Sequence, residues 1–386
     1  MDICVLNPFF YPYAGGTEKV LLEVYRRLAK DNNITVISAV LKPNEKQSEE
    51  EICGINVIRL PSRYINIPNA PMPFLVIHGI TQAVKKCDSE LYHINNRYQF
   101  FPSTVKAIKK KHKLALTLHN ALPKNIDLLT DMGGILYDKL WGRKVMHAAD
   151  LITGVSKNTI DTTVPQREMH KAKVIYNGVD LDLFCWKNRV DREVETVRRS
   201  TGVKGARIIL SNGRLTTQKG QTYLIKAVSE LVADGRDVGL VIIGKGPLQA
   251  QLSREAERAG LGERFKIISG VKEEKLPYYY NMANVFALPS LYEPAGLVLL
   301  EALSCKTPVV ATEIGGITEM CGSSGFYVKP KDVNGLKEKL EYVIEHAEGR
   351  DVANCAKNGR KRMVKYHDWD KIADQYENAF MEVLKL

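Results

Sequence analysis

Short apolar runs rich in β-branched residues recur along the chain, and stretches with helical spacing of apolar side chains separate them. A run that is apolar throughout is typical of a strand buried on both faces of a parallel sheet, with the intervening stretches as crossover helices. The pattern therefore predicts an α/β protein. The predicted strands form a first series, at Ile3–Pro8, Ile34–Val40, Ile55–Leu60, Glu90–Ile94, Leu114–His119, Leu151–Val155 and Val174–Tyr176, and a second, at Arg207–Ser211, Gly239–Ile243, Phe265–Ile268, Val285–Pro289 and Pro308–Ala311.

The two series of strands are separated by a charged stretch, Asn188–Gly205, which has little apolar content and is predicted to form one polar helix. A length of 386 residues is sufficient for two domains. We therefore predict two doubly wound domains, at residues 1–185 and 186–369, joined near residues 180–190. The final segment is predicted to be helical from residue 354, with a break at residues 367–370.

The composition restricts the class of partner. A formal net charge of +11 predicts attraction to anions, which include phosphorylated substrates, acidic lipids and nucleic acids. We expect no nucleic acid as a partner, because aromatic residues are not interleaved on a basic face. No uninterrupted apolar stretch is long enough to cross a bilayer, and the first residues resemble a strand rather than a signal peptide. We therefore expect a cytoplasmic protein that docks at most peripherally on a membrane.

The most informative stretch is residues 288–302, where a predicted strand, a turn and a helix follow one another between two glutamates, Glu293 and Glu301. Pro294 has a fixed φ and no N–H, so it suits the opening of a helix. The backbone amides that open this helix are a predicted anion site, with close approach allowed by the glycine. These amides belong to Gly296, Leu297 and Val298.

A carboxylate repels an anion, so Glu293 and Glu301 are expected to accept hydrogen bonds from hydroxyl groups on either side of it. The two glutamates would lie on the order of 10 Å apart along a helix. An anion between two polyols is the outline of a nucleotide diphosphate sugar. The alternative is that two glutamates simply favour the positive end of an amphipathic helix.

This segment resembles the signature of retaining GT-B glycosyltransferases, most closely glycosyltransferase family 4, in which two glutamates are separated by seven residues. The likeness continues to Gly315 and Gly316, with two departures: Ala295 stands where Phe or Cys is frequent, and Lys306 stands where Gly is usual. The resemblance implies a GT-B fold, with two Rossmann-like domains facing a central cleft. It also implies that the last helix, residues 370–386, crosses back to the first domain, although periodicity alone also allows an ordinary terminal helix on the second.

Two predicted loops have residues suited to phosphate. Gly15 and Gly16 follow the first strand and open a helix, which permits either a tight turn or a backbone approach to phosphate. The resemblance assigns them to the donor diphosphate. Arg214 and Lys219 lie on the loop after the first strand of the second domain, where open α/β sheets bind ligands. Their spacing resembles the Arg and Lys pair of the family, so we expect them to neutralise the leaving diphosphate.

Two further residues are assigned by the resemblance. Gly244 ends a predicted strand, but the dinucleotide fingerprint fails because Gln249 occupies its third glycine position, and the loop is expected near the nucleobase. His119 also ends a predicted strand, where a lone histidine is ordinarily a core or surface residue. The resemblance implies that His119 faces the donor sugar and contacts a hydroxyl and the phosphate without a covalent role.

The metal-ligating residue types are scattered. The seven cysteines are odd in number and lack a C-x-x-C pair, which predicts reduced thiols. Asp180 and Asp182 formally spell the D-x-D with which glycosyltransferases of another fold hold a metal. They follow a strand-to-turn signal, so we predict that these carboxylates cap the next turn. We therefore expect no metal and no cofactor.

The sequence thus predicts a retaining hexosyltransferase that uses a UDP- or GDP-sugar and an acceptor hydroxyl, on a lipid-linked glycan or other glycoconjugate precursor. The alternatives are a nucleotide-sugar epimerase or a phosphorylase on the same fold, or a binding protein without turnover. The predicted catalytic residues are His119, Arg214, Lys219 and Glu293, and the predicted donor-binding residues are Gly15, Gly16, Arg214, Lys219, Gly244, Gly296, Leu297, Val298 and Glu301.

A basic segment of the first domain, Thr104–Lys113, precedes the strand of His119. Each basic residue near an anionic bilayer adds about 1 kcal/mol of attraction, so Lys109, Lys110 and Lys111 predict an anionic membrane surface as a partner. A solvated lysine-rich helix is an equally open alternative.

Overall fold

The computed structural model describes residues 1–13, 15–43, 45–65, 74–95, 102–109, 111–120, 132, 136 and 138–385. The chain folds into two compact units. The first contains Met1–Asn177 and Trp369–Leu386, and the second contains Gly178–Asp368. The division after Asn177 lies earlier in the chain than the expected one after residue 185.

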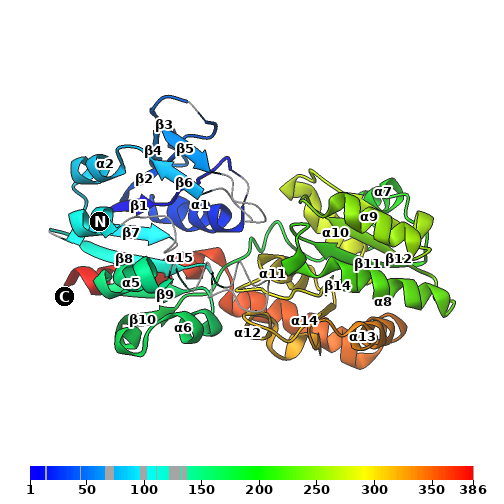
Figure 1. Ribbon diagram of the computed structural model, residues 1–386. Coiled ribbons are helices and arrows are strands. Elements are labelled where there is room, and N and C mark those ends of the chain that lie inside the picture. The colour runs from blue at the N-terminus through cyan, green and yellow to red at the C-terminus, as the bar shows by residue number, and fades with distance from the viewer. Residues whose placement is uncertain are drawn as a thin grey trace. The chain divides into compact units, whose positions relative to one another are not determined.

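An eight-stranded sheet in the order β10-β9-β8-β7-β1-β2-β4-β3 forms the centre of the first unit (Figure 1). Its neighbours pair in parallel, except that β3 joins β4 antiparallel at the edge. The strands are β1 Asp2–Leu6, β2 Asn33–Ala39, β3 Ser48–Ile52, β4 Ile55–Leu60, β7 Leu91–Asn95, β8 Lys113–Leu118, β9 Leu151–Gly154 and β10 Ala172–Val174, with a separate hairpin of β5 Ser62–Ile65 and β6 Phe74–Ile77.

The first six strands predicted in this series are present, and β10 begins two residues before the predicted Val174. The sequence analysis missed β3 because its residues are polar and exposed, as an antiparallel edge strand permits. The helices of this unit are α1 Gly16–Leu28, α2 Ile80–Cys87, α3 Pro102–Lys109, α5 Arg143–Ala148, α6 Lys157–Thr163 and α15 Trp369–Lys385, with a π-helix at Asp138–Gly142 and a 3₁₀-helix at Gln166–Lys171.

The terminal helix α15, red in Figure 1, packs against α1 and β8 of the first unit. Its buried face includes Ile372, Tyr376 and Phe380. At its edge, Asn32 Nδ2 donates a hydrogen bond to Glu377 Oε1 (2.9 Å). The last helix therefore completes the hydrophobic core of a unit that otherwise ends near residue 177.

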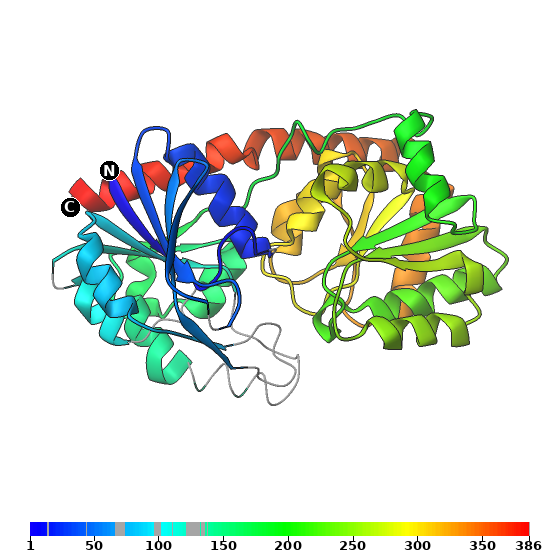
Figure 2. The ribbon, with the colours of Figure 1, turned by 90° about the horizontal axis from the view of Figure 1, so that it is seen from above.

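A six-stranded parallel sheet in the order β13-β12-β11-β14-β15-β16 forms the second unit, with helices on both faces (Figure 2). All five predicted strands match it within one residue at each end, and β16 was not predicted. The strands are β11 Arg207–Asn212, β12 Val238–Ile243, β13 Phe265–Ile268, β14 Val285–Leu288, β15 Val309–Thr312 and β16 Phe326–Val328.

The helices of the second unit include the predicted polar helix in a shorter form, because α7 spans only Arg192–Ser200. The others are α8 Gln221–Ala233, α9 Gln249–Arg258, α10 Leu276–Met282, α11 Leu297–Ser304, α12 Ile317–Cys321, α13 Val333–Glu345 and α14 Arg350–Tyr366, with 3₁₀-helices at Thr217–Lys219, Gly262–Arg264, Glu273–Lys275 and Gly322–Ser324. Within the described part of the chain, no helix has the length and apolarity needed to cross a membrane.

Candidate active site

The loops after β11 and β14 meet at one edge of the second unit's sheet. These strands are parallel neighbours, so the loops that follow them leave the sheet at the same edge. The loops are joined where the Leu291 amide donates to the Gln218 carbonyl (2.7 Å). Gly220 has φ +64, and a Cβ there would lie 2.1 Å from the Pro289 carbonyl oxygen. A side chain at position 220 would therefore force the two loops apart.

This edge brings Lys219 and Glu293 together. The Lys219 ammonium forms an ion pair with Oε2 of Glu293, and the two side chains are 17% and 8% exposed. Oε1 of Glu293 accepts a hydrogen bond from the Gly296 amide (3.2 Å), and the Ser290 hydroxyl donates to Oε2 (3.4 Å). The Glu293 carboxylate thus contacts a cation, a backbone amide and a hydroxyl. Removing either member of a largely buried ion pair leaves the other charge without its partner, which destabilises the protein.

The helix α11 begins at Leu297, not at Pro294 as the sequence suggested. Gly296 precedes it with φ +56, a left-handed conformation that favours glycine. The Gly296 amide already donates to Glu293, so it is not available to an anion, and the expected anion site is left with the amides of Leu297 and Val298. Leu297 and Val298 are the first residues of α11, where backbone amides have no acceptor within the helix.

Glu301 lies farther along α11 and is 5% exposed. The Tyr280 hydroxyl donates to its Oε2 (2.7 Å), and Asn212 Nδ2 donates to the same hydroxyl (2.9 Å). Burial, together with the charge of Glu301, raises the pKa of Tyr280 well above its usual value. Glu301 is therefore tied through Tyr280 to the carboxyl end of β11.

The other two predicted residues of this unit lie on neighbouring loops. Arg214 is exposed, and its carbonyl accepts a hydrogen bond from Gln221 Nε2 (3.0 Å). Gly244 follows β12, where a Cβ would lie 1.9 Å from the Gly213 carbonyl oxygen. The glycine at 244 is thus required for the close packing of the loops after β11 and β12.

In the first unit, the predicted glycines lie at the start of α1, beside the buried carboxylate of Glu18. Gly15 caps α1, and a Cβ there would lie 2.0 Å from a carboxylate oxygen of Glu18, which is 4% exposed. Gly16 begins α1. The sequence analysis did not select Glu18, although a glutamate two residues after a glycine pair at a helix start was the available signal.

His119 lies just after β8 and is 8% exposed. Burial lowers its pKa to about 4, so the imidazole is neutral at neutral pH. Its Nε2 forms a hydrogen bond with Asn95 Oδ1 (3.1 Å), an oxygen that can only accept. His119 is therefore suited to hydrogen bonding rather than to carrying charge.

The Asp180 carboxylate caps a turn, as the sequence predicts. Its Oδ1 accepts hydrogen bonds from the amides of Asp182 (3.1 Å) and Leu183 (2.8 Å). Among the residues with a described placement, no group of three or more His, Cys, Asp or Glu side chains is arranged to hold a metal ion. All seven cysteines are free thiols.

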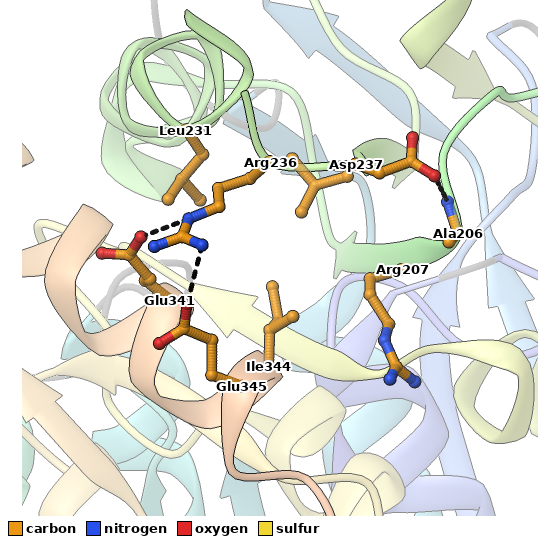
Figure 3. Close-up of a pocket in the computed structure, with 9 residues that line it drawn as sticks. Ala206, Arg207, Leu231, Arg236, Asp237, Glu341, Ile344 and Glu345 are labelled. Carbon is orange, nitrogen blue, oxygen red and sulfur yellow. Dashed lines mark hydrogen bonds and ion pairs between the residues drawn. The ribbon is translucent and has the colours of Figure 1, made fainter. Parts of the chain in front are cut away.

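A small cavity lies at the opposite edge of the same sheet, where β11 and β12 begin (Figure 3). Arg236 spans its mouth in ion pairs with Glu341 (2.6 Å) and Glu345 (2.9 Å), above the apolar side chains of Leu231 and Ile344. Its volume of about 200 Å³ is below the 300–1,000 Å³ that is usual for small-molecule sites. None of the predicted site residues lines this cavity.

The profile of Glycosyltransferase Family 4 matches residues 14–183, and that of Glycosyl transferases group 1 matches residues 193–362. An uncharacterised glycosyltransferase of Methanocaldococcus jannaschii is 31% identical over 224 residues, which is 56% of this chain and 55% of that protein. A GDP-mannose-dependent alpha-(1-6)-phosphatidylinositol monomannoside mannosyltransferase of Mycolicibacterium smegmatis is 33% identical over 59% of this chain and 61% of its own. These matches thus span little more than half of each relative.

The likeness in fold extends over nearly the whole chain. The structure of HepE from Anabaena, solved with UDP and glucose, superposes with a TM-score of 0.76 at 20% identity and covers 99% of both chains. The fold expected from the resemblance is confirmed.

Proposed function

Because the chain is a GT-B glycosyltransferase, with a Glycosyltransferase Family 4 segment followed by a Glycosyl transferases group 1 segment, we propose that it transfers a hexosyl unit from a nucleotide diphosphate sugar to an acceptor hydroxyl. The donor is a UDP- or GDP-sugar. HepE was solved with UDP, and the M. smegmatis relative is named for GDP-mannose, which supports this choice of nucleotides.

The observation that carries the proposal is the ion pair of Lys219 and Glu293 at the carboxyl edge of the sheet. In the absence of donor, the two charges satisfy each other. A diphosphate that binds at this edge takes over the Lys219 ammonium and releases the Glu293 carboxylate for sugar hydroxyls. Arg214, exposed on the same loop as Lys219, adds a second cation for the diphosphate.

The remaining residues divide between the nucleotide and the sugar. Glu301 accepts hydrogen bonds from ribose hydroxyls, and the amides of Leu297 and Val298 face the diphosphate at the start of α11. Gly244 leaves room beside the nucleobase. In the first unit, Gly15 and Gly16 contact the donor diphosphate.

The reaction proceeds with retention of configuration. The acceptor oxygen bonds to the anomeric carbon on the face from which the diphosphate oxygen leaves, and the acceptor proton passes to the departing phosphate. Lys219 and Arg214 stabilise the charge that develops on that phosphate, so no metal is needed. His119, neutral at physiological pH, contacts a sugar hydroxyl and the phosphate without forming a covalent bond.

The acceptor hydroxyl belongs to a lipid-linked glycan or another glycoconjugate precursor, and the enzyme works in the cytoplasm at the membrane surface. The name of the M. smegmatis relative specifies a phosphatidylinositol monomannoside, which supports a lipid acceptor.

A thermal-shift screen with UDP, GDP and their sugars tests the donor, because a ligand that binds only the folded state raises the melting temperature. The shifting sugar is then supplied for turnover, and release of its nucleoside diphosphate is measured in excess EDTA. We expect both a shift and EDTA-resistant release. A shift without release under any acceptor would instead favour a binding protein, and a loss in EDTA that manganese restores would contradict a metal-free mechanism.

A further inference from the structure

The first unit exposes a group of large apolar side chains just before and within its π-helix. Met132 and Leu136 are each 59% exposed, Leu140 is 43% exposed and Trp141 is 38% exposed. Met132 and Leu136 have helical backbone conformation, and Leu140 and Trp141 lie in the π-helix. We call these four residues the apolar surface. Solvent exposure of so many large side chains in one short segment marks an interaction site.

Within residues 138–146, the exposed polar side chains are basic. Lys139, Arg143 and Lys144 are exposed and interleave with or follow the apolar residues, while Val145 and Met146 point into the core. Apolar side chains, an indole and cations on one exposed stretch are the composition of a helix that lies in a membrane interface.

The carboxylates of this region are neutralised. Between residues 132 and 150, Asp138 is buried and pairs with Arg143 (3.8 Å), and Asp150 pairs with Lys109 (2.6 Å). Nearby, Glu168 is 3% exposed and pairs with Lys171 (2.7 Å) and His147 (2.8 Å). Among the described residues beside the apolar side chains, the exposed charges that remain after these pairings are therefore positive, complementary to an anionic bilayer.

The same ion pairs change the role of the basic segment Thr104–Lys113. Lys109 is held by Asp150, and α3 packs against α5, which begins at Arg143. Lys110 lies outside the described residues. The lysine segment thus supports the region electrostatically, but the apolar side chains that a bilayer would bury lie on the following segment.

We propose that the protein docks on anionic membranes by inserting Met132, Leu136, Leu140 and Trp141 into the headgroup and acyl boundary, with Lys139 and Lys144 at the lipid phosphates. The proposal deepens the proposed function and rests on it for the lipid nature of the acceptor. Docking places the first unit at the surface from which a lipid-linked acceptor presents its hydroxyl. The docking itself requires neither donor nor turnover.

Co-sedimentation with vesicles of phosphatidylcholine and phosphatidylglycerol, against vesicles of phosphatidylcholine alone, tests the docking. We expect binding that needs the anionic lipid and falls with added salt. Replacing Leu140 and Trp141 by Ser should reduce the partition coefficient by a factor of about ten to a hundred. The matched control replaces Trp186 and Val190 by Ser, which removes one exposed indole and one exposed aliphatic side chain from the second unit and should have no effect.

The charge contribution is tested separately. Lys139→Glu with Lys144→Glu should weaken binding to anionic vesicles, whereas Lys85→Glu with Lys86→Glu, on α2 of the same unit, changes the net charge equally and should weaken it much less. An equal effect of both pairs would show nonspecific attraction and overturn the proposal. This comparison keeps its force even if the Leu140 and Trp141 variant does not fold.

Tryptophan fluorescence reports on the apolar surface directly. Of the three tryptophans, Trp369 is 1% exposed, so in a Trp186→Phe chain Trp141 is the exposed indole. We expect its emission to shift to the blue on anionic vesicles and to be quenched by brominated acyl chains. Vesicle binding with unchanged Trp141 emission would overturn the proposal.

Two other results would also overturn it. If the chain ignores vesicles but forms dimers that the Leu140 and Trp141 substitutions abolish, the apolar surface joins two copies. If the chain ignores vesicles yet releases nucleoside diphosphate from its donor, the docking and the membrane location fail while the proposed glycosyl transfer stands. Binding to vesicles without any turnover would support the docking and contradict the proposed glycosyl transfer.

Discussion

The two units bury their polar groups in different ways. In the first, the interior of the sheet holds uncharged side chains: the hydroxyl of Tyr25 shares a hydrogen bond with Nδ1 of His93, whose Nε2 bonds the Thr117 hydroxyl (2.6 Å). Thr117 in turn bonds the hydroxyl of Thr153 (2.6 Å), so the network crosses β7, β8 and β9. At the carboxyl edge of the second unit's sheet, by contrast, a largely buried pair of opposite charges, Lys219 and Glu293, lies on two loops.

The charge of these groups distinguishes polar residues that stabilise the fold from polar residues that bind a ligand. Burial, followed by the effect of His119, lowers the pKa of His93 to about 3, so the network is neutral and fully inside the protein. Neutral groups that satisfy one another have no need of a ligand. Lys219 and Glu293 instead carry opposite charges on two loops at the sheet edge. An anionic ligand can replace Glu293 as the partner of Lys219, and the freed carboxylate can then accept hydrogen bonds from hydroxyl groups.

The sharpest test of this comparison is Lys219→Ala. If the edge is catalytic, removing the cation from the leaving diphosphate should lower turnover by about two to four orders of magnitude. The measurement is kcat for release of nucleoside diphosphate. Lys245→Ala, on the next loop of the same unit, removes an equal charge and should leave kcat nearly unchanged. A loss of melting temperature with unchanged kcat would make Lys219 a structural residue like those of the first unit.

Glu293→Gln should reduce turnover by about two to three orders of magnitude, because the interaction with sugar hydroxyls is strongest in the transition state. The amide oxygen of Gln can still accept the hydrogen bond from Gly296, so the start of α11 should persist. We therefore expect kcat to change far more than the free energy of unfolding, measured by urea titration. An unaltered kcat would remove Glu293 from the catalytic group.

The interior of the first unit predicts a pH dependence of stability. The pKa values of His93 and His119 are lowered to about 3 and about 4 from 6.5, so between pH 6.5 and 4 the unfolded chain binds more protons than the folded chain. The free energy of unfolding should thus fall as the pH falls, by about 2 kcal/mol for each histidine at pH 5. Urea titrations at pH 7 and pH 5 measure this decrease.

Replacing His93 by Asn should remove about half of that pH dependence, whereas His170→Gln, at an exposed position of the same unit, should leave it intact. If the free energy of unfolding of His93→Asn falls between pH 7 and pH 5 as much as that of the unaltered chain, other groups titrate. The network inside the first unit's sheet would then not account for the pH dependence.

The sequence selected residues at the edge of the second unit's sheet and none of the polar network inside the first unit's sheet. Lys219 and Glu293 stand beside turns, where local sequence determines the backbone, and Glu301 follows at a fixed spacing on α11. The network of His93, Thr117 and Thr153 depends on the register of three strands far apart in the chain, so no local pattern identifies it. This is why the strands were predictable and their polar partners were not.

The ion pair at the edge was also missed, although both of its residues were selected. Lys219 and Glu293 follow different strands, and only the adjacency of β11 and β14 brings them together. The start of α11 was misplaced for a local reason: Glu293 bonds the Gly296 amide, which holds residues 293–296 in a turn and delays the helix beyond Pro294.

A smaller effect is expected at the other glutamate of the edge. Glu301→Ala should weaken binding of UDP or GDP about tenfold to a hundredfold through loss of the ribose hydrogen bond. Isothermal titration calorimetry measures the affinity. Tyr280→Phe separates this role from a structural one, because it removes the hydroxyl that donates to Glu301 and keeps the carboxylate. Equal losses in both variants would mean that Glu301 acts by holding Tyr280, in the manner of the first unit's network.

The smallest effect concerns backbone stability next to the edge. After α11, the Lys306 amide donates to Leu303 (3.1 Å) and the Thr307 amide to Ala302 (3.0 Å), which is the Schellman arrangement. That arrangement puts Lys306 at φ +56, where glycine is favoured. The Lys306 ammonium lies 5.1 Å from the centre of the Trp186 ring, a contact that offsets part of the strain.

Lys306→Gly should therefore raise the free energy of unfolding by about 0.5 kcal/mol, and Lys306→Ala should lower it, since alanine keeps the left-handed conformation but loses the contact with Trp186. Urea titration at neutral pH, where the buried histidines do not titrate, gives the order of the three chains. The order Gly, Lys, Ala assigns the strain to the backbone. A glycine variant less stable than alanine would show that the contact with Trp186, rather than the turn, determines the residue at this position.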